Sequence, residues 1–356
     1  MPRVIGIDPG TVSIDICGLD NGRLFLDHSF PTADTLRDPT AFVARLLGAG
    51  AVDLIVGPSG YGLPCISAAE IPEDDLRLAF LAAEGEPGGI GGLRTLVRAL
   101  GRSGLPVMLT PGVIHLTSVP AHRKVNRVDM GTADKVCAVA LAVREQAERR
   151  GCAVGETAFV LLELGGAFTA AIAVQGGRIV DGLGGSSGPL GLRAAGALDG
   201  EVAFLAGRVS KSMVFTGGFS AIAGGTDLGA SGPVVRRARE AYLEGAVKAV
   251  TSLRVAAPDA TEVILSGRVA RSHDVYEDVS RRLRRVAAVS SVELLRGFSA
   301  SSMQAAHGAA VMADGLAGGA AAELVEHLGI REASGTVLDY LHVISREHAR
   351  RTLGLG

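Results

Sequence analysis

The sequence predicts an α/β protein built from two similar halves. Each half opens with the same pattern, in which a buried apolar strand ends in an acidic residue, a glycine turn follows, and two further strands return. Asp8 ends the first strand of the first copy, and Glu163 takes the same place in the second. Two acidic turns that lie 155 residues apart, one at the start of each half, indicate a duplicated fold that can clamp a nucleotide.

The first half shows the element order β-β-β-α-β-α-β, which predicts a mixed sheet flanked by helices. The expected strands are 4–7, 12–19, 23–30, 53–56 and 107–109, and the expected helices are 41–47 and 93–100. A loop rich in glycine and proline spans 57–64, directly after a strand. Ligands often bind at such a loop in α/β sheets, although a plain surface crossover is an equally good explanation.

The turn after the first strand carries groups that suit a phosphorylated ligand. Residues 8–11 have the sequence DPGT, so a carboxylate, a glycine amide and a hydroxyl stand at one hairpin tip. Backbone amides and hydroxyls bind phosphate oxygens, and a carboxylate such as Asp8 binds hydrated Mg²⁺. Taken alone, an ordinary N-terminal hairpin is the simpler interpretation of this stretch.

A charged stretch over 121–135 precedes the apolar helix that we expect over 136–150. It contains Asp129, Asp134 and several basic residues, with Thr132 as the expected N-cap. Such side chains are suited to orient a phosphate, a metal ion or an attacking group. Helix capping and solvated charge explain them equally well.

The second half is expected to continue with strands and then with long helices. The expected strands are 158–162, 169–174 and 178–181, and a strand and turn are expected over 213–219. The expected helices are 234–255, 276–286 and 337–351, and a glycine-rich loop spans 182–189. The arginines of the basic helix over 276–286 are expected to form a solvated face. The helix over 337–351 is expected to pack on the first domain.

Composition argues against several classes of function. The chain has 356 residues and a formal net charge of −2, which gives no sign of a nucleic-acid or anionic-membrane partner. No run approaches the roughly 20 apolar residues of a membrane span, and the N-terminus lacks signal-peptide features. The four cysteines are far apart with no C-x-x-C pair, so a reducing cytoplasm fits better than a zinc site or a disulfide framework.

Taken together, the motifs resemble those of the acetate and sugar kinase, heat-shock chaperone and actin superfamily, and of butyrate and acetate kinases in particular. Residues 8–11 resemble the first phosphate motif, and residues 163–166 (ELGG) resemble the second. Residues 263–270 (VILSGRVA) are similar to the adenosine motif, and 305–310 (AAHGAA) to the second interdomain helix. The motifs follow the family's order along most of the chain.

The resemblance implies a two-domain actin-like ATPase fold of the ribonuclease H-like type, with a nucleotide cleft between the domains. Domain I is expected to comprise 1–135 plus 319–356, and domain II to comprise 136–318. ATP and Mg²⁺ are the implied cofactors, with Asp8 and Glu163 as the residues that hold hydrated Mg²⁺. The residues implied to cradle phosphates or to border the adenosine are Gly10, Thr11, Gly165, Gly166 and Gly267.

The acceptor side departs from the family pattern. Acetate kinases carry a histidine where this chain has Met130, and butyrate kinases carry an arginine where it has residues 58–59 (PS). Arg193 resembles the second active-site arginine of acetate kinase, which implies a role in stabilising the transferred phosphoryl group. Asp129 or Asp134 is expected to orient or deprotonate the acceptor.

The sequence leaves two functions open. The first is an ATP-dependent phosphotransferase with a small-molecule acceptor, carboxylates among the candidates. The alternative is a nucleotide-dependent regulator or scaffold ATPase with no phosphoryl acceptor. An activator ATPase of the dehydratase type is disfavoured, because no cysteine pair is present to hold an iron–sulfur cluster. A homo-oligomer is compatible with the sequence.

Overall fold

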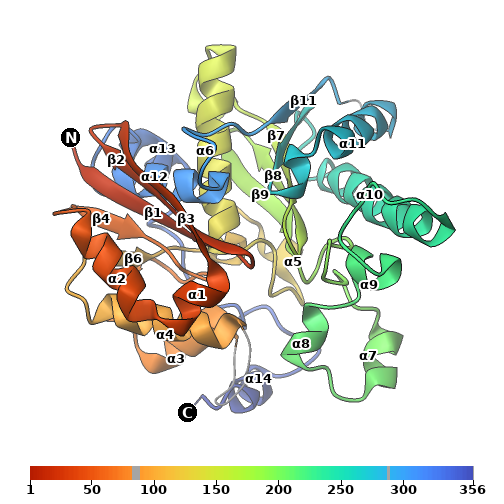
Figure 1. Cartoon of the computed structure of the whole chain (residues 1–356), viewed down its shortest axis with the longest axis horizontal. Coiled ribbons are helices and arrows are strands. Elements are labelled where there is room, and N and C mark those ends of the chain that lie inside the picture. Colours follow the sequence, from red (N-terminus) through yellow and green to blue (C-terminus); the bar gives the residue numbers. More distant parts are fainter. Residues whose placement is uncertain (82–88, 287–288, 356) are drawn as a thin grey trace. The chain divides into compact units, whose positions relative to one another are not determined.

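A computed structural model describes residues 1–81, 89–286 and 289–355, which form two compact units (Figure 1). The first unit comprises Met1–Val128, Thr132–Gly155 and Arg296–Gly356, and the second comprises Asp129–Gly131 and Glu156–Leu295. Each unit contains one β-sheet with helices, so the predicted α/β class is confirmed.

The boundaries between the two units differ from the predicted domain boundaries. The predicted boundaries lie between residues 135 and 136 and between residues 318 and 319. Two helices account for the difference, since α6 (Ala133–Arg150) and α12 (Gln304–Leu316) belong to the first unit. They pack on one another, and α12 also packs on β1 (Arg3–Pro9). Both helices therefore complete the core of the first unit.

Within the described residues, the sheet of the first unit has six strands in the order β3-β2-β1-β4-β6-β5. The first three strands form an antiparallel meander, and β1 pairs in parallel with β4, which gives the mixed sheet that was predicted. The remaining strands of this sheet are β2 (Ser13–Asp20), β3 (Arg23–Pro31), β4 (Leu54–Val56), β5 (Ile66–Ser67) and β6 (Val107–Leu109).

The other helices described in the first unit are α1 (Thr32–Arg37), α2 (Pro39–Gly48), α3 (Glu73–Phe80), α4 (Gly89–Gly101), α5 (Ala121–Lys124), α13 (Ala322–His327) and α14 (Arg346–Thr352). The helix predicted over 337–351 is mostly wrong, because only its end is helical, as α14. Ser345 caps α14 by accepting a hydrogen bond from the His348 amide, so the helix begins there. None of the helices in the described ranges is long and apolar enough to cross a membrane.

The sheet of the second unit has the strand order β11-β10-β7-β8-β9. Its strands are β7 (Phe159–Leu164), β8 (Thr169–Gln175), β9 (Arg178–Leu183), β10 (Glu262–Ser266) and β11 (Ser291–Leu294). Strands β7, β8 and β9 form a second antiparallel meander, and β10 pairs in parallel with β7. The second meander therefore repeats the first, as the duplicated pattern predicted.

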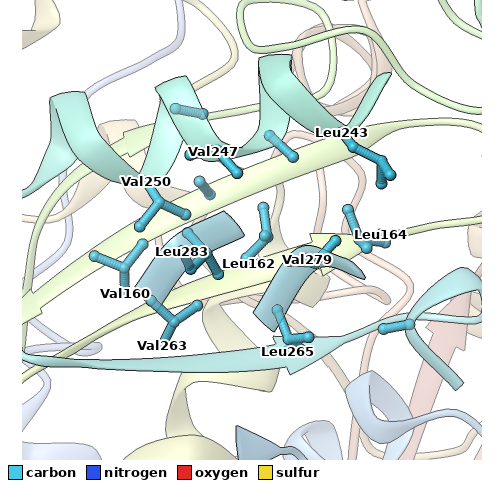
Figure 2. Packing of buried hydrophobic residues seen from close by; sticks show 14 of the residues in the cluster. Val160, Leu162, Leu164, Leu243, Val247, Val250, Val263, Leu265, Val279 and Leu283 are labelled. Atoms are coloured by element: carbon cyan, nitrogen blue, oxygen red, sulfur yellow. The ribbon is translucent and has the colours of Figure 1, made fainter. Parts of the chain in front are cut away.

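One face of this second sheet is covered by α10 (Pro233–Leu253) and α11 (His273–Val286), as Figure 2 shows. Side chains two residues apart on each strand point to the same face, and they meet apolar side chains spaced three or four residues apart on the helices. The residues labelled there are Val160, Leu162, Leu164, Leu243, Val247, Val250, Val263, Leu265, Val279 and Leu283. This packing holds β7 and β10 in place, and both strands end at residues of the candidate site.

A strand and turn were predicted over 213–219, and the strand is wrong, because short helices occupy the segment between β9 and α10. They are α7 (Gly200–Ala206), α8 (Lys211–Val214) and α9 (Phe219–Ala223). Gly217 has a φ of 86°, which lies outside the β region, and it forms only an isolated bridge with Ala194. Phe219 is fully buried, and its ring lies 6.4 Å from that of Tyr242.

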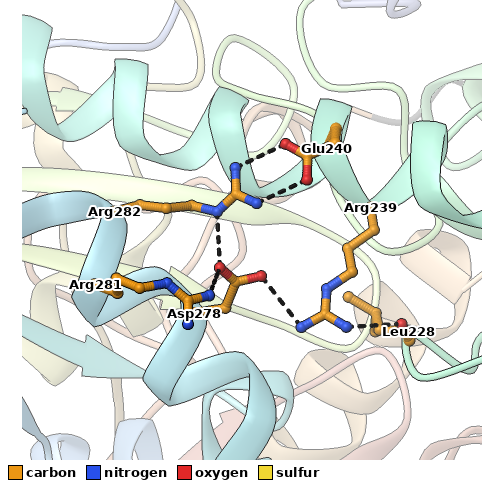
Figure 3. Close-up of polar contacts among 6 residues, drawn as sticks. All are labelled: Leu228, Arg239, Glu240, Asp278, Arg281 and Arg282. Atoms are coloured by element: carbon orange, nitrogen blue, oxygen red, sulfur yellow. Dashed lines mark hydrogen bonds and ion pairs between the residues drawn. The ribbon is translucent and has the colours of Figure 1, made fainter. Parts of the chain in front are cut away.

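Three of the four arginines of α11, at positions 281, 284 and 285, are exposed as the predicted solvated face requires, whereas Arg282 is partly buried in an ion-pair network. The buried carboxylate of Asp278 pairs with Arg282 at 3.0 Å and with Arg239 of α10 at 3.2 Å (Figure 3). Arg282 also donates two hydrogen bonds of 2.8 Å to Glu240 of α10. Burial alone would raise the pKa of Asp278, but hydrogen bonds from Arg282 and Arg281 outweigh it and hold the pKa below its usual value.

We predict that Asp278→Asn lowers the free energy of unfolding by about 2 to 3 kcal/mol, less than for a fully buried ion pair. The change removes a counter-charge from Arg239 and Arg282, whose side chains are only 26% and 25% exposed. Because the folded pKa is depressed, this stabilisation is complete at neutral pH. It is lost as the pH falls below about 5 and through the folded pKa. Urea unfolding at several pH values measures both effects.

The matched control is Arg281→Ala, because Arg281 contacts the same carboxylate but its side chain is 58% exposed. We expect it to change the free energy of unfolding by less than about 0.5 kcal/mol, as for other exposed ion pairs. If both variants lowered the free energy of unfolding by the same amount, Asp278 would not be the centre of this ion-pair network.

Glycine residues allow α12 to approach its neighbours very closely. All residues of α12 are buried. A Cβ atom on Gly308 would lie 1.9 Å from the carbonyl oxygen of Cys137 in α6. A Cβ atom on Gly6 in β1 would lie 2.1 Å from the backbone nitrogen of Ala310 in α12. Backbone therefore touches backbone on two sides of this helix, and no larger residue fits at either position.

We predict that Gly308→Ala lowers the free energy of unfolding by about 3 kcal/mol or more, because the added methyl group meets rigid backbone. Gly48→Ala is the control, since Gly48 is helical and no atom lies within 4 Å of its Cβ position. That change should be neutral or stabilise the protein by up to about 1 kcal/mol through helix propensity. Thermal unfolding of both variants tests the contact, and unchanged stability of Gly308→Ala would refute it.

Candidate functional site

The first candidate cluster lies at the tip of the β1–β2 hairpin, in the first unit. Asp8 is buried near the end of β1, and Thr11 is exposed at the tip. A Cβ atom on Gly10 would lie 2.6 Å from the carbonyl oxygen of Ser13, so the turn requires glycine. The hydroxyl of Thr32 donates a hydrogen bond of 2.7 Å to the Gly10 carbonyl. The predicted carboxylate and hydroxyl are therefore presented by one well-anchored turn.

A second carboxylate, which the sequence pattern did not reveal, faces Asp8. The β1–β2 register pairs Asp8 with Asp15, and residues directly opposite on antiparallel strands have Cβ atoms about 4.5 to 5.5 Å apart. Asp15 is 1% exposed and accepts a hydrogen bond of 2.8 Å from the Ser13 hydroxyl. Two neighbouring buried carboxylates suit a divalent cation, whose charge offsets their repulsion.

Asp134 lies in the first turn of α6, near this hairpin tip. Burial opposes its ionisation, but the charge of Lys135 and hydrogen bonds from Lys135 and Thr132 hold its pKa below the usual value. Burial raises the pKa of the Cys137 thiol, and the charges of Asp134 and Asp8 raise it further. The thiol therefore lies close to both carboxylates, and the structure brings Asp8 and Asp134 to one corner of the first unit.

The loop over 57–64 borders the same corner. A Cβ atom on Gly57 would lie 2.4 Å from the carbonyl oxygen of Ile7, near the end of β1. The carbonyl of Gly60 accepts a hydrogen bond of 3.1 Å from the amide of Ala133, the first residue of α6. The loop therefore packs against both β1 and α6, and its ligand-facing role stays a prediction.

The second candidate cluster lies at the carboxyl ends of β7 and β10, in the second unit. The carboxylate of Glu163 accepts a hydrogen bond of 3.3 Å from the Ser266 hydroxyl. Gly267 follows with a φ of 91°, and a Cβ atom there would lie 2.5 Å from the carbonyl oxygen of Leu164. The predicted adenosine turn and the second acidic turn are thus direct neighbours, and only glycine fits between them.

Gly165 and Gly166 lie in the turn that joins β7 to β8. The amide of Gly165 donates a hydrogen bond of 2.9 Å to the carbonyl of Phe168. A Cβ atom on Gly165 would lie 2.8 Å from that oxygen. Gly165 therefore shapes the turn, and its own amide is engaged within it.

Arg193 is held beside this glycine turn by its backbone. The amides of Arg193 and Ala194 donate hydrogen bonds of 3.0 and 3.1 Å to the carbonyl of Ala167, and the carbonyl of Arg193 accepts one of 2.8 Å from Gly218. The Arg193 residue is exposed. The structure therefore brings together Arg193 and the second phosphate motif, which the sequence predicted from separate segments.

Asp129 belongs to the second unit, where it organises the loop over 184–187. Its carboxylate accepts hydrogen bonds from the Gly131 amide at 3.1 Å and from the amide and hydroxyl of Ser186 at 2.9 and 3.0 Å. Among the predicted catalytic residues, Asp134 thus groups with Asp8, whereas Asp129 and Arg193 lie in the other unit. Nothing in the sequence pattern indicated the contact with Ser186.

Each of the two candidate clusters contains carboxylate side chains. In the described part of the chain, no group of three or more His, Cys, Asp or Glu side chains is arranged to hold a metal ion. Asp8 and Asp15 supply two carboxylates in the first unit, and Glu163 supplies one in the second. Mg²⁺ in nucleotide sites is usually bound by one or two carboxylates, water and phosphate oxygens, and the Asp8–Asp15 pair of the first unit supplies two such carboxylates.

Several solved carboxylate kinases share this fold. A propionate kinase from Francisella tularensis subsp. tularensis SCHU S4 gives a TM-score of 0.62 at 12% identity, over 87% of this chain and 98% of that one. An acetate kinase from Porphyromonas gingivalis gives a TM-score of 0.57 at 13% identity, over 87% of this chain and 98% of that one. An acetate kinase from Entamoeba histolytica gives a TM-score of 0.57 at 9% identity, over 80% of this chain and 87% of that one.

These likenesses define the fold class. The protein shares the fold of these kinases, which confirms the predicted two-domain actin-like fold. The chain belongs to the family described as "Protein of unknown function (DUF1464)", which it matches over residues 6–343. The comparison with curated protein sequences finds no match.

Proposed function

We propose that this protein is an ATP-dependent phosphotransferase that uses Mg²⁺ and acts on a small-molecule acceptor. The observation that carries the proposal is the convergence of residues predicted from separate motifs. Glu163, Gly166, Arg193 and Gly267 lie at or beside the carboxyl ends of two neighbouring strands in the second unit. The kinase-like fold supports the same conclusion.

In this proposal Asp8 binds hydrated Mg²⁺, and Glu163 shares that role. Bound Mg²⁺ supplies charge neutralisation at the phosphate oxygens. Thr11 and the two glycine turns hold phosphate oxygens, and Gly267 borders the adenosine. Arg193 donates hydrogen bonds to the phosphoryl group during its transfer, when negative charge on its outer oxygens is greatest.

The low pKa of Asp134 and the hydrogen bonds accepted by Asp129 favour a phosphoryl acceptor that needs no general base. The pKa of Asp134 is held below its usual value by Lys135 and Thr132, so its carboxylate is a weak proton acceptor. The carboxylate of Asp129 already accepts three hydrogen bonds. Both side chains are therefore suited to orient an acceptor, and a short-chain carboxylate is ionised without their help. We propose such a carboxylate as the acceptor class.

One observation favours a second candidate function. Met130, which stands where acetate kinases carry a histidine, is 1% exposed and belongs to the core. A nucleotide-dependent regulator that binds ATP without a phosphoryl acceptor has no need of that histidine. In either case we place the protein in the reducing cytoplasm, since its four cysteines are free thiols. Neither proposal includes a nucleic-acid or membrane partner.

We predict that ATP with Mg²⁺ raises the melting temperature of the protein, because a ligand that binds only the folded state stabilises it by mass action. Asp8→Ala should abolish the Mg²⁺-dependent part of this shift. The control is Asp34→Ala, which changes an aspartate of the same unit whose side chain is 59% exposed. Differential scanning fluorimetry measures the shifts. No shift at millimolar nucleotide would count against nucleotide binding altogether.

We also predict that Arg193→Ala separates the two candidate functions. For a phosphotransferase, kcat should fall by about 10²-fold or more while ATP affinity changes little, because the arginine acts mainly in the transition state. The control is Arg178→Ala, another exposed arginine of the second unit. The assay is a coupled kinase measurement with a panel of short-chain acids, sugars and polyols. A blank panel, with slow ATP hydrolysis equal in Arg193→Ala and wild type, would favour the regulator.

A further inference from the structure

Asp129 lies in a three-residue piece of chain that belongs to the second unit, although the chain on either side of it belongs to the first. Both Asp129 and Met130 are buried. A Cβ atom on Gly184 would lie 1.7 Å from the Oδ1 atom of Asp129. A Cβ atom on Gly182 would lie 2.0 Å from the carbonyl oxygen of Met130. Residues 129–131 are therefore packed directly against the end of β9 and the loop that follows it.

Asp129 anchors the loop over 184–188 with both its backbone and its side chain. Its carbonyl accepts a hydrogen bond of 3.2 Å from the Gly184 amide and another from the Ser187 hydroxyl. Its carboxylate accepts the two hydrogen bonds from Ser186 that are described above. Hydrogen bonds to a carboxylate are roughly twice as strong as those between neutral groups. Because the loop has the sequence GGSSG, its backbone is unusually free in isolation, and such anchors are needed to fix its conformation.

The anchored loop packs on Phe168, in the turn between β7 and β8. A Cβ atom on Gly185 would lie 2.6 Å from the Cβ, Cγ and Cδ1 atoms of Phe168, so only glycine allows this contact. The carbonyl of Ala167, the residue before Phe168, accepts the hydrogen bonds of the Arg193 and Ala194 amides. The loop therefore supports the part of the turn to which the backbone of Arg193 is bonded.

A second connection to Arg193 runs through the last residue of the anchored loop. The carbonyl of Gly188 accepts a hydrogen bond of 2.8 Å from the Ala197 amide. A Cβ atom on Gly196 would lie 2.6 Å from the same carbonyl oxygen, so backbone meets backbone there. Residues 189–196, with Arg193 among them, thus form an excursion that is closed at its base by Gly188. The anchored loop holds one side of that base.

We propose that Asp129 is a positioning residue, which fixes the place of Arg193 through the loop over 184–188. This inference rests on the proposed function, because that function gives Arg193 its role on the transferred phosphoryl group. A donor stabilises a transition state only when it is held in place beforehand, and a displacement of about 1 Å can lower a rate about 10²-fold. Asp129 therefore contributes to catalysis through the placement of Arg193 and does not itself accept a proton.

The first test is Asp129→Asn, which keeps the size of the side chain but turns one acceptor oxygen into a donor nitrogen. That donor then faces the N–H or O–H groups of Gly131 or Ser186, so the loop loses an anchor. We expect kcat to fall about tenfold to a hundredfold while ATP affinity changes little. Ser186→Ala, which removes only the hydroxyl contact, should have a smaller effect in the same direction. The control is Asp259→Asn, since the exposed Asp259 accepts a hydrogen bond of 2.6 Å from Gln175, outside these contacts.

The second test asks whether Asp129 acts through Arg193. The effects of independent residues on a rate multiply, whereas the effects of residues that act as a unit do not. Arg193→Ala removes the group that the loop positions, so adding Asp129→Asn to it should lower kcat by no more than about a further twofold. If the two effects multiply in full, or if Asp129→Asn keeps the wild-type kcat, the proposal is overturned.

The third test measures the loop itself and needs no acceptor. In hydrogen–deuterium exchange of the full-length protein, peptides that span 184–197 should exchange about tenfold faster in Asp129→Asn than in wild type, with circular dichroism unchanged. Arg193→Ala and Asp259→Asn should leave this exchange as it is in wild type. Equal exchange in Asp129→Asn and wild type overturns the proposal. Faster exchange together with a blank acceptor panel supports the placement of Arg193 by Asp129 and overturns only the proposed phosphotransfer.

Discussion

The first unit depends on the close approach of α12 to β1 and α6, which glycine alone permits. The backbone of α12 meets β1 at Gly6 and α6 through Gly308. Because Asp8 stands near the end of β1 and Asp134 in the first turn of α6, the same contacts set the spacing of these two carboxylates. A side chain at either glycine would push the strand or the helix away from α12. The fold of this unit and the geometry of its candidate cluster therefore depend on one packing arrangement.

Local patterns in the sequence were sufficient for both meanders, because neighbouring residues determine each hairpin. The alternation of apolar residues and the glycine turns identify β1, β2 and β3, and again β7, β8 and β9. Local patterns failed where a residue distant in the sequence determines the local structure or the burial of a side chain. The apolar residues before Gly217 suggested a strand. The backbone of Gly217 has a positive φ and leaves the extended conformation, and Phe219 packs on Tyr242. Arg282 looked solvated because Glu240 lies on another helix.

The candidate residues divide in the same way. Asp8 and Glu163 were predictable because each ends a buried strand before a glycine turn. Asp15 was not singled out, because its place opposite Asp8 depends on the hairpin register, and a slip of one residue would turn it to the other face. The contact between Asp129 and Ser186 joins residues that are 57 positions apart and belongs to an irregular loop. Such a loop has no periodicity from which the contact can be inferred.

The discontinuity of the first unit has a consequence for the order of synthesis. Gly6 lies against Ala310, which is added 304 residues later. At about 5 to 20 residues per second, the ribosome needs roughly 15 to 60 seconds to make the intervening chain. During this interval the side of β1 that α12 covers lacks its partner helix, while nearly all of the second unit, residues 156–295, is completed. The part of the protein made first thus completes its packing only after most of the chain has been made.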